Sequence, residues 1–324
     1  MQERSSHQRS SGWTPATWNV RLIRGRCSRN SISNNTQAGT ETMRDFSGKT
    51  AVVTGAASGL GKSIALALAS YKCRIGIADI NREKAEGTLK QVIRKGASGE
   101  IYHLDVSKPE EVEAMAQHFF DTWGGVDLLF NNAGVAAAGR VGDIPLEDWK
   151  WIIDINFWGV VYGCHSFIPR MKAQGHGYII NTASAGGFLP LPEMSPYNTS
   201  KAAVVSLSET LRSELAPHNI GVTVVCPTFF RSDLHLSLRY TDGFEREAGQ
   251  AAITNAKVEP DAVAEAIIRA IKKRRLYVVP QLAGRIHWLQ RRLFPSTYVS
   301  GLAFLNKRGY AKPLLLWVLR RGLL

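Results

Sequence analysis

Short runs of β-branched and apolar residues alternate with longer, helix-periodic segments from Lys49 onward. Such runs suit strands that are buried on both faces, and the segments between them are long enough for helices that cross back over a sheet. We predict strands at Thr50–Thr54, Arg74–Ala78, Ile101–Leu104, Leu128–Asn131, Tyr178–Thr182, Val222–Cys226 and Tyr277–Val279, and helices at 60–71, 82–94, 109–123, 146–172, 197–216 and 260–273.

This alternation predicts an α/β fold with a parallel sheet of about seven strands and helices on both faces. Ligands in such sheets bind beyond the carboxyl ends of the strands. Polar and ionisable residues at those ends are therefore the candidates for a functional site.

A glycine-rich loop, Thr54-Gly55-Ala56-Ala57-Ser58-Gly59-Leu60-Gly61, follows the first predicted strand and opens the first predicted helix. Glycines there permit a tight turn and let the backbone approach a pyrophosphate, which the helix N-terminus stabilises. A glycine trio alone is often a plain turn, but its position between a strand and a helix favours dinucleotide binding.

A carboxylate ends the second predicted strand. Asp79 lies eighteen residues after Gly61, where it would accept hydrogen bonds from the adenosine ribose and repel a 2′-phosphate. Ser58 in the loop is not basic, so NAD is favoured over NADP. NADP stays an alternative, because Asp79 could merely cap a turn and Arg74 or Arg82 could reach a phosphate.

Four further polar positions follow later strands. Tyr197 and Lys201 are four residues apart, which places them on one face of a predicted helix. Ser184 lies just past the strand at 178–182. Asn131-Asn132-Ala133-Gly134 ends the fourth strand, and Asn156 lies within the helix that follows it.

Together these residues resemble the short-chain dehydrogenase/reductase family. The resemblance covers about residues 46–280 and implies a single Rossmann-like, doubly wound domain. The matching positions, in the family's order and spacing, are the glycine loop, Asp79, Asp105-Val106, Asn131–Gly134, Asn156, Ser184, Tyr197 and Lys201.

The chemistry of the last four positions suits interconversion of an alcohol and a carbonyl. Free tyrosine has a pKa of about 10, and a nearby ammonium and an oxidised nicotinamide would both lower it. Tyr197 is thus expected to be the acid/base and Lys201 to lower its pKa and bind the nicotinamide ribose. Ser184 would orient the substrate oxygen. The resemblance gives Asn156 a water that links Lys201 to solvent; no metal is needed.

The resemblance also gives a set of cofactor-binding residues. One position departs from the family, since Pro227-Thr228 stands where Pro-Gly is usual, and Ser232 aligns with a threonine that binds the nicotinamide carboxamide. The expected cofactor-binding residues are Gly55, Ser58, Gly59, Leu60, Gly61, Asp79, Asp105, Val106, Asn132, Ala133, Gly134, Tyr197, Lys201, Pro227 and Ser232.

Apolar side chains near the predicted site indicate a hydrophobic secondary alcohol or its ketone as substrate. Phe188 lies between Ser184 and Tyr197, and Phe229 and Phe230 begin the next loop. We expect Ser184, Phe188, Phe229 and Phe230 to contact the substrate, and residues 233–256 to form a mobile lid. The alternative is that about half of these side chains are core.

Charge is unevenly distributed along the 324 residues, whose net charge is +13. Residues 1–44 carry +5, residues 272–324 carry +12 with no acidic residue, and the body between them carries −4. An acidic body argues against a nucleic-acid surface. The four cysteines have no ligand-like spacing, which predicts neither a zinc site nor a disulfide framework and favours a reducing compartment.

The chain is expected to divide into three parts: a disordered N-terminal extension over 1–44, a catalytic domain over 45–280 and a basic amphipathic extension over 281–324. The first part is either a transit peptide or an upstream extension before a natural start at Met43, and we favour the second interpretation.

The C-terminal part suits an anionic membrane surface, because basic residues alternate with Trp and Leu. Ile286, Leu289 and Leu293 share a helical face, and Leu314–Leu319 is an apolar run. Alternatively, the C-terminal part packs against a partner subunit or forms part of the substrate entrance. We therefore expect a cytoplasmic protein, peripheral on a membrane.

Two functions of different classes follow. The first is an NAD(P)-dependent oxidoreductase acting on a hydrophobic alcohol or ketone. The second is a membrane-associated NAD(H) sensor or scaffold with little turnover. The family resemblance also implies a homodimer or homotetramer.

Overall fold

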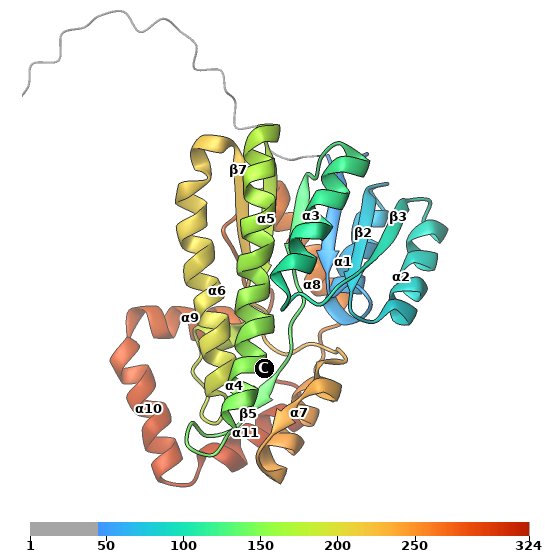
Figure 1. Cartoon of the computed structure of the whole chain (residues 1–324). Coiled ribbons are helices and arrows are strands. Elements are labelled where there is room, and N and C mark those ends of the chain that lie inside the picture. Colours follow the sequence, from blue (N-terminus) through green and yellow to red (C-terminus); the bar gives the residue numbers. More distant parts are fainter. Residues whose placement is uncertain (1–44, 324) are drawn as a thin grey trace, which may run out of the picture. The chain divides into compact units, whose positions relative to one another are not determined.

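The central sheet has seven parallel strands in the order β3-β2-β1-β4-β6-β7-β9. The chain enters it at β1, winds outward to β3, returns to the middle at β4 and then winds the other way (Figure 1). This doubly wound order confirms the predicted fold class. The strands are β1 (Thr50–Thr54), β2 (Arg74–Asp79), β3 (Ser98–His103), β4 (Leu128–Asn131), β6 (Gly177–Thr182), β7 (Ile220–Val225) and β9 (Tyr277–Val278).

The computed structural model describes residues 45–323. The predictions for residues 1–44 lie outside this range.

Different helices cover the two faces of the sheet: α1 (Gly59–Ala69), α2 (Arg82–Arg94) and α8 (Pro260–Lys272) on one, and α3 (Pro109–Trp123), α5 (Gly159–Gln174) and α6 (Ser195–Glu214) on the other. Successive strand residues point to opposite faces. In β1, Ala51 and Val53 therefore pack under the first set, whereas Val52 packs under the second. The two buried cores fix the sheet, and with it the positions of the strand ends.

The segment predicted as one helix over 146–172 is interrupted. It consists of α4 (Leu146–Ile153), a π-helical turn η1 (Asp154–Trp158) and α5. Asn156 is at the centre of this turn and is fully buried. A π-helical turn inside an α-helix inserts a residue and often marks a functional position.

The predicted lid contains regular elements. They are η4 (Leu234–Ser237), β8 (Arg239–Tyr240) and α7 (Gly243–Thr254). A capping box between Asp242 and Glu245 begins α7. β8 pairs in parallel with β5 (Ala137–Ala138), and two short 3₁₀ turns, η2 (Ala185–Gly187) and η3 (Ala216–His218), lie elsewhere. The mobility of this lid stays a prediction.

Three helices form the C-terminal extension: α9 (Leu282–Leu293), α10 (Pro295–Lys307) and α11 (Ala311–Arg320). The two predicted helical stretches lie in α9 and α11, whereas α10 was not predicted. Trp288 of α9 packs on Tyr277 of β9, with ring centroids 5.2 Å apart, and α11 packs on α7 through Leu319. In Figure 1, α9 lies beside α6, α11 lies near α4 and α7, and α10 connects the two at the left. Within residues 45–323 no helix is both long and apolar enough to cross a membrane.

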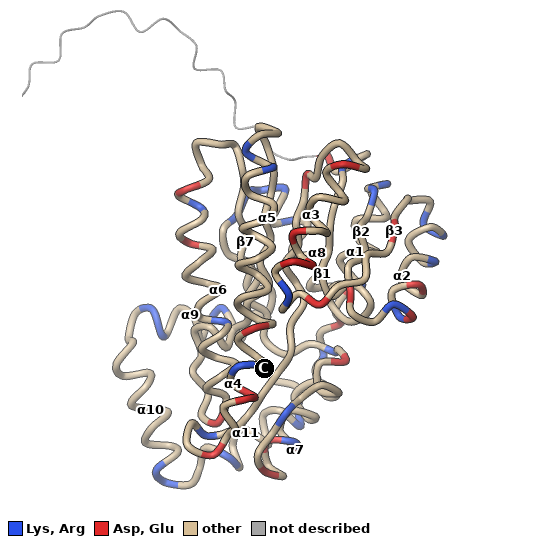
Figure 2. The backbone as a smooth tube through the Cα atoms, in the orientation of Figure 1, with Lys and Arg blue, Asp and Glu red and all other residues tan. Residues whose placement is uncertain are grey.

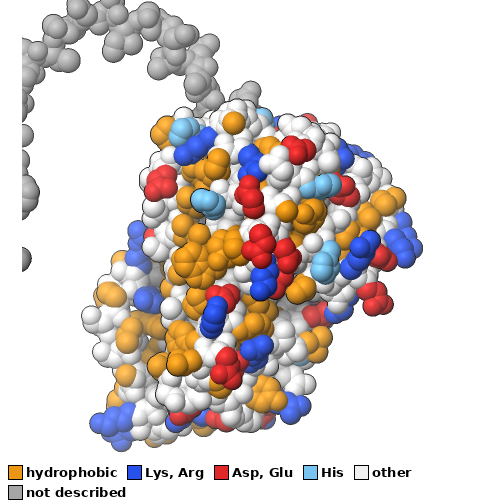
Figure 3. Space-filling model, in the orientation of Figure 1, with side chains coloured by type: hydrophobic (Ala, Val, Ile, Leu, Met, Phe, Trp, Pro, Cys, Tyr) orange, Lys and Arg blue, Asp and Glu red, His pale blue; other side chains and the backbone are white. Residues whose placement is uncertain are grey.

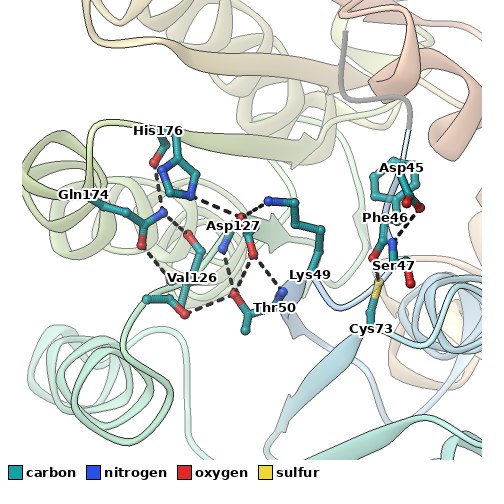
Figure 4. Close-up of polar contacts among 11 residues, drawn as sticks. Asp45, Phe46, Ser47, Lys49, Thr50, Cys73, Val126, Asp127, Gln174 and His176 are labelled. Atoms are coloured by element: carbon teal, nitrogen blue, oxygen red, sulfur yellow. Dashed lines mark hydrogen bonds and ion pairs between the residues drawn. The ribbon is translucent and has the colours of Figure 1, made fainter. Parts of the chain in front are cut away.

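The amino ends of β1, β4 and β6 are joined by one carboxylate (Figure 4). Asp127 accepts hydrogen bonds from the backbone N–H of Thr50 and from Lys49 Nζ, both at 2.9 Å, and lies 3.2 Å from His176 Nε2. Burial acts to raise the pKa of Asp127, but these hydrogen bonds and the Lys49 charge hold it below its usual value.

Candidate active site

The glycine-rich loop packs too tightly to carry side chains at two of its positions. A Cβ at Gly61 would lie 2.0 Å from the carbonyl oxygen of Gly55, and one at Gly55 would lie 2.8 Å from Cα of Ala133. Gly55 also has a φ of +66°, in the left-handed region that favours glycine. The loop is thereby held against the segment that follows β4.

The N-terminus of α1 has the features of an anion site. Its N-cap residue is Ser58, whose side chain caps none of the free N–H groups, and its first turn has no acidic residue. Asp79 ends β2 and accepts a hydrogen bond from the N–H of Ala57 at 2.9 Å. These residues fit a dinucleotide: the helix end would hold its pyrophosphate, and Asp79 would accept hydrogen bonds from its adenosine ribose.

Hydrogen bonds connect the carboxyl ends of β1, β4 and β6. The Thr54 hydroxyl accepts from the N–H groups of Asn132 (2.9 Å) and Ala133 (3.1 Å), and the Thr182 hydroxyl donates to Asn132 Oδ1 at 3.3 Å. Thr54 and Thr182 were not among the predicted site residues. Each is the last residue of a predicted strand, so its hydroxyl lies at the strand end where ligands bind, and this position could have identified it.

The structure brings Ser184, Tyr197 and Lys201 together. Tyr197 and Lys201 lie in the first turns of α6, and Lys201 Nζ is 5.8 Å from the centre of the Tyr197 ring. Lys201 Nζ donates to the carbonyl oxygen of Thr182 at 3.1 Å. A hydrogen bond links Ser184 to Tyr197, and the Ser184 hydroxyl also lies 3.4 Å from the Pro227 carbonyl oxygen.

Burial dominates the electrostatics of this trio. It raises the pKa of Tyr197, and the hydrogen bond with Ser184 only partly offsets this. Burial also lowers the pKa of Lys201 to about 8. The sequence led us to expect a depressed pKa at Tyr197. The residues of the chain by themselves do not produce it, and a further positive charge in the cavity would act in that direction.

Asn156 lies behind the trio rather than in the cavity. Its Oδ1 accepts from the N–H of Val135 at 2.8 Å, and its Nδ2 donates to the Val135 carbonyl oxygen at 2.9 Å and to Ser200 Oγ at 3.2 Å. The side chain thereby fixes the segment after β4 against α6. The water relay expected at Asn156 stays a prediction.

Comparison with known proteins identifies the family. The family model described as "short chain dehydrogenase" matches residues 49–243. The chain belongs to the short-chain dehydrogenase/reductase family. The match includes the glycine loop, Asp79 and the trio, and it ends before α9–α11.

Individual relatives agree with this assignment. A "CLA biosynthesis dehydrogenase/reductase" of Lactiplantibacillus plantarum is 34% identical over 73% of this chain and 89% of its own length. A short-chain dehydrogenase/reductase of Burkholderia phymatum, solved in complex with NAD, is 33% identical with a TM-score of 0.74 over 77% of this chain and 95% of its own. An alcohol dehydrogenase of Thermococcus sibiricus, complexed with 5-hydroxy-NADP, is 25% identical with a TM-score of 0.62, covering 71% of this chain and 95% of that one.

One cavity of about 780 Å³ joins the parts of this short-chain dehydrogenase/reductase site. All the predicted cofactor residues line it, as do Phe229 and Phe230. Two predicted site residues do not line it. Asn156 is buried behind the wall, and Phe188 packs on Trp288 with ring centroids 6.3 Å apart.

Where Thr228 stands in place of the family's usual glycine, residues Gln281 and Gly284 contact the chain. Gln281 Oε1 accepts from the Thr228 N–H at 3.0 Å, and Gln281 Nε2 donates to the Phe229 carbonyl oxygen at 3.3 Å. A Cβ at Gly284 of α9 would lie 2.9 Å from the Thr228 methyl group. The extension therefore supports the loop that carries Pro227 and Ser232.

Sequence reasoning missed an apolar part of the cavity wall that comes from outside the family match. In α10 the residues concerned, Tyr298, Leu302 and Leu305, have the spacing of one helical face, and this pattern could have revealed them. The other apolar lining residues lie in segments that the sequence had singled out: Phe244 and Ile253 of α7 in the predicted lid, and Leu314, Leu315 and Val318 of α11 in the run for which the substrate entrance was an alternative.

Proposed function

We propose that this short-chain dehydrogenase/reductase interconverts a hydrophobic secondary alcohol and its ketone, with Tyr197 as acid/base and NAD as the preferred cofactor. The observation that carries the proposal is the convergence of Ser184, Tyr197 and Lys201 on one cavity that also holds the glycine loop and Asp79. The chain's assignment as an oxidoreductase of the family supports the reaction class.

The proposed roles divide the proton chemistry among three side chains. In oxidation, Tyr197 Oη takes the hydroxyl proton of the alcohol, and in reduction it returns a proton to the carbonyl oxygen. Ser184 donates a hydrogen bond to that same oxygen. Lys201 stabilises the phenolate by its charge, and its lowered pKa suits a group that also exchanges protons. A bound nicotinamide would accept or supply the hydride and, when oxidised, would add the positive charge that the phenolate needs.

The preference for NAD rests on Asp79. Its carboxylate stands at the end of β2 in the cavity wall, where a 2′-phosphate would meet a negative charge. Among the solved relatives, one holds NAD and another holds an NADP derivative, so the family alone does not decide the preference.

The hydrophobic substrate follows from the wall beyond the trio. Leu189, Met194, Phe229 and the residues of α7, α10 and α11 present mainly apolar surface. Lys312, at the rim, forms ion pairs with Glu193 at 3.0 Å and Asp242 at 3.7 Å. Because its charge is neutralised, the wall gives no clear anion site for an acidic substrate.

A second copy of the chain is the proposed partner for the face formed by α5 and α6. Figure 3 shows hydrophobic side chains gathered over this face. Trp158, the last residue of η1, is 42% exposed and stacks on Tyr162 of α5. An exposed aromatic patch of this kind suits association of copies.

The test compares the wild type with Tyr197→Phe on long-chain and short-chain secondary alcohols, using NAD and NADP. We expect Tyr197→Phe to lower kcat by about 10²- to 10⁴-fold, because the proton acceptor is lost. Binding of NADH, measured by fluorescence, should change little. Tyr71→Phe is the matched control and should keep its activity, because Tyr71 packs on Phe46 outside the cavity.

Three results would contradict parts of the proposal. Retained turnover in Tyr197→Phe would remove Tyr197 as the acid/base. Tight NADH binding by the wild type without turnover of any alcohol or ketone would favour the NAD(H) sensor instead. A clear preference for short polar alcohols would end the assignment of a hydrophobic substrate.

A further inference from the structure

The C-terminal extension has an unusual distribution of apolar side chains. Its inner side lines the cavity through residues such as Leu302, Leu305 and Leu315. Its outer side is also apolar. On α9 the residues Leu282, Ile286, Leu289 and Leu293 recur at helical spacing and are between 48 and 69% exposed.

Exposure continues along the other two helices. Phe294 lies at the junction of α9 and α10 and is 62% exposed, and Phe304 and Trp317 are about half exposed. Soluble monomers rarely leave so many large apolar side chains uncovered in one segment, so an apolar surface of this kind marks an interaction site.

Positive charge accompanies this surface. The extension lies within residues 272–324, which hold twelve basic residues and no acidic one, and Figure 2 shows blue but no red along α9 and α10. Arg292 lies over the Trp288 ring, Arg308 over Phe304 and Arg321 over Trp317, at 4.3 to 5.6 Å from the ring centres. Paired basic and aromatic side chains suit the boundary between lipid headgroups and acyl chains.

The charge also decides between possible partners. A second copy docking through the same surface would bring two strongly positive segments together, which is unfavourable. An anionic lipid surface offers both complementary charge and an apolar layer for the exposed residues Leu282, Ile286, Leu289 and Leu293, which we call the outer stripe of α9.

We propose that the outer surface of α9–α11 docks on anionic membranes, and that the cavity behind it receives its substrate from the bilayer. The substrate would be a membrane-dissolved lipid bearing a secondary alcohol or ketone. This second part rests on the proposed function, whereas the docking itself does not. The same helices would then face lipid on one side and the cavity on the other.

The test is co-sedimentation of the full chain with vesicles of phosphatidylcholine, with and without phosphatidylglycerol. Leu289→Glu combined with Leu293→Glu changes the outer stripe and no cavity residue. The matched control is Leu146→Glu combined with Ile93→Glu, whose side chains are 81% and 56% exposed on α4 and α2. We expect binding to the phosphatidylglycerol vesicles to fall by about tenfold or more in the first variant, because apolar area is lost and negative charge is added.

Turnover of a water-soluble secondary alcohol without vesicles is measured in parallel and should be equal in the wild type and both variants. Salt should weaken vesicle binding of the wild type, since the attraction is partly electrostatic. Equal vesicle binding by both variants, or no binding by the wild type, overturns the docking. A change from oligomer to monomer in the first variant would assign the stripe to a second copy instead. If the wild type shows no turnover, the proposed function is contradicted, whereas the docking result still stands.

Discussion

At the scale of single residues, backbone partners restrict what the buried polar side chains can do. Both amide hydrogens of Asn156 are donated, to Val135 and to Ser200, so this amide has no proton left for a water or substrate. Lys201 is likewise anchored on the Thr182 carbonyl oxygen. Tyr197 and Ser184, which form a hydrogen bond with each other, both line the cavity.

Asp79 gives a prediction at this scale. Asp79→Asn keeps one oxygen for the Ala57 N–H, loses the second acceptor, which binds the Asn81 N–H, and removes the charge that repels a 2′-phosphate. We expect the ratio of kcat/KM for NADP to that for NAD to rise by about tenfold or more. Glu83→Gln in the first turn of α2, whose side chain is outside the cavity wall, is the control and should leave the ratio unchanged. An unaltered ratio in Asp79→Asn would place cofactor selection elsewhere.

At the scale of elements, strands and long helices were predictable because burial imposes a regular hydrophobic period on them. The π-helical turn at Asn156 was not, since its side chain is bonded to Val135, which no local hydrophobic pattern indicates. The capping box Asp242–Glu245 was a visible signal for α7 that the lid prediction did not use. Helix α10 lacks a buried residue and was missed because its apolar residues face both the cavity and the outside.

The packing of α9 on the loop after β7 gives a prediction at this scale. Gly284→Ala would bring a Cβ to 2.9 Å from the Thr228 methyl group. Alanine favours a helix by roughly 1 kcal/mol over glycine, so α9 itself should not suffer. We expect the KM for NAD to rise several-fold, because the loop that carries Ser232 is displaced.

Thr228→Ser removes that methyl group and should restore the KM when combined with Gly284→Ala. The matched control is Gly301→Ala in α10, where a Cβ would have no neighbour within 4 Å. Steady-state kinetics with NAD would measure all four proteins. A normal KM in Gly284→Ala alone would mean that α9 does not position the loop.

At the scale of the whole described region, the two ends of the strands, carboxyl and amino, differ in what their residues do. The carboxyl ends of the strands border the cavity and the side chains to which we assign the proton chemistry, whereas the amino ends of β1, β4 and β6 are held together by Asp127. Stability and activity should therefore be separable by substitution. The sequence indicated the carboxyl ends, because their residues form a family pattern. It did not indicate Asp127, whose partners Lys49 and His176 are far apart along the chain.

Asp127→Asn tests this separation through the free energy of unfolding. The folded pKa of Asp127 is lowered, so its contribution is present above the unfolded value of about 4 and is lost as the pH falls through the folded pKa. We expect the variant to be less stable than the wild type by about 1–3 kcal/mol at neutral pH, since Lys49 loses its charged partner. This difference should shrink as the pH falls below about 4, because the wild-type carboxylate is then protonated as well. Urea unfolding at several pH values measures it, with Asp121→Asn on the exposed side of α3 as control. A stability difference that stayed constant with pH would show that the charge of Asp127 does not hold these strands together. KM values equal to those of the wild type would show that the amino and carboxyl ends of the strands act independently.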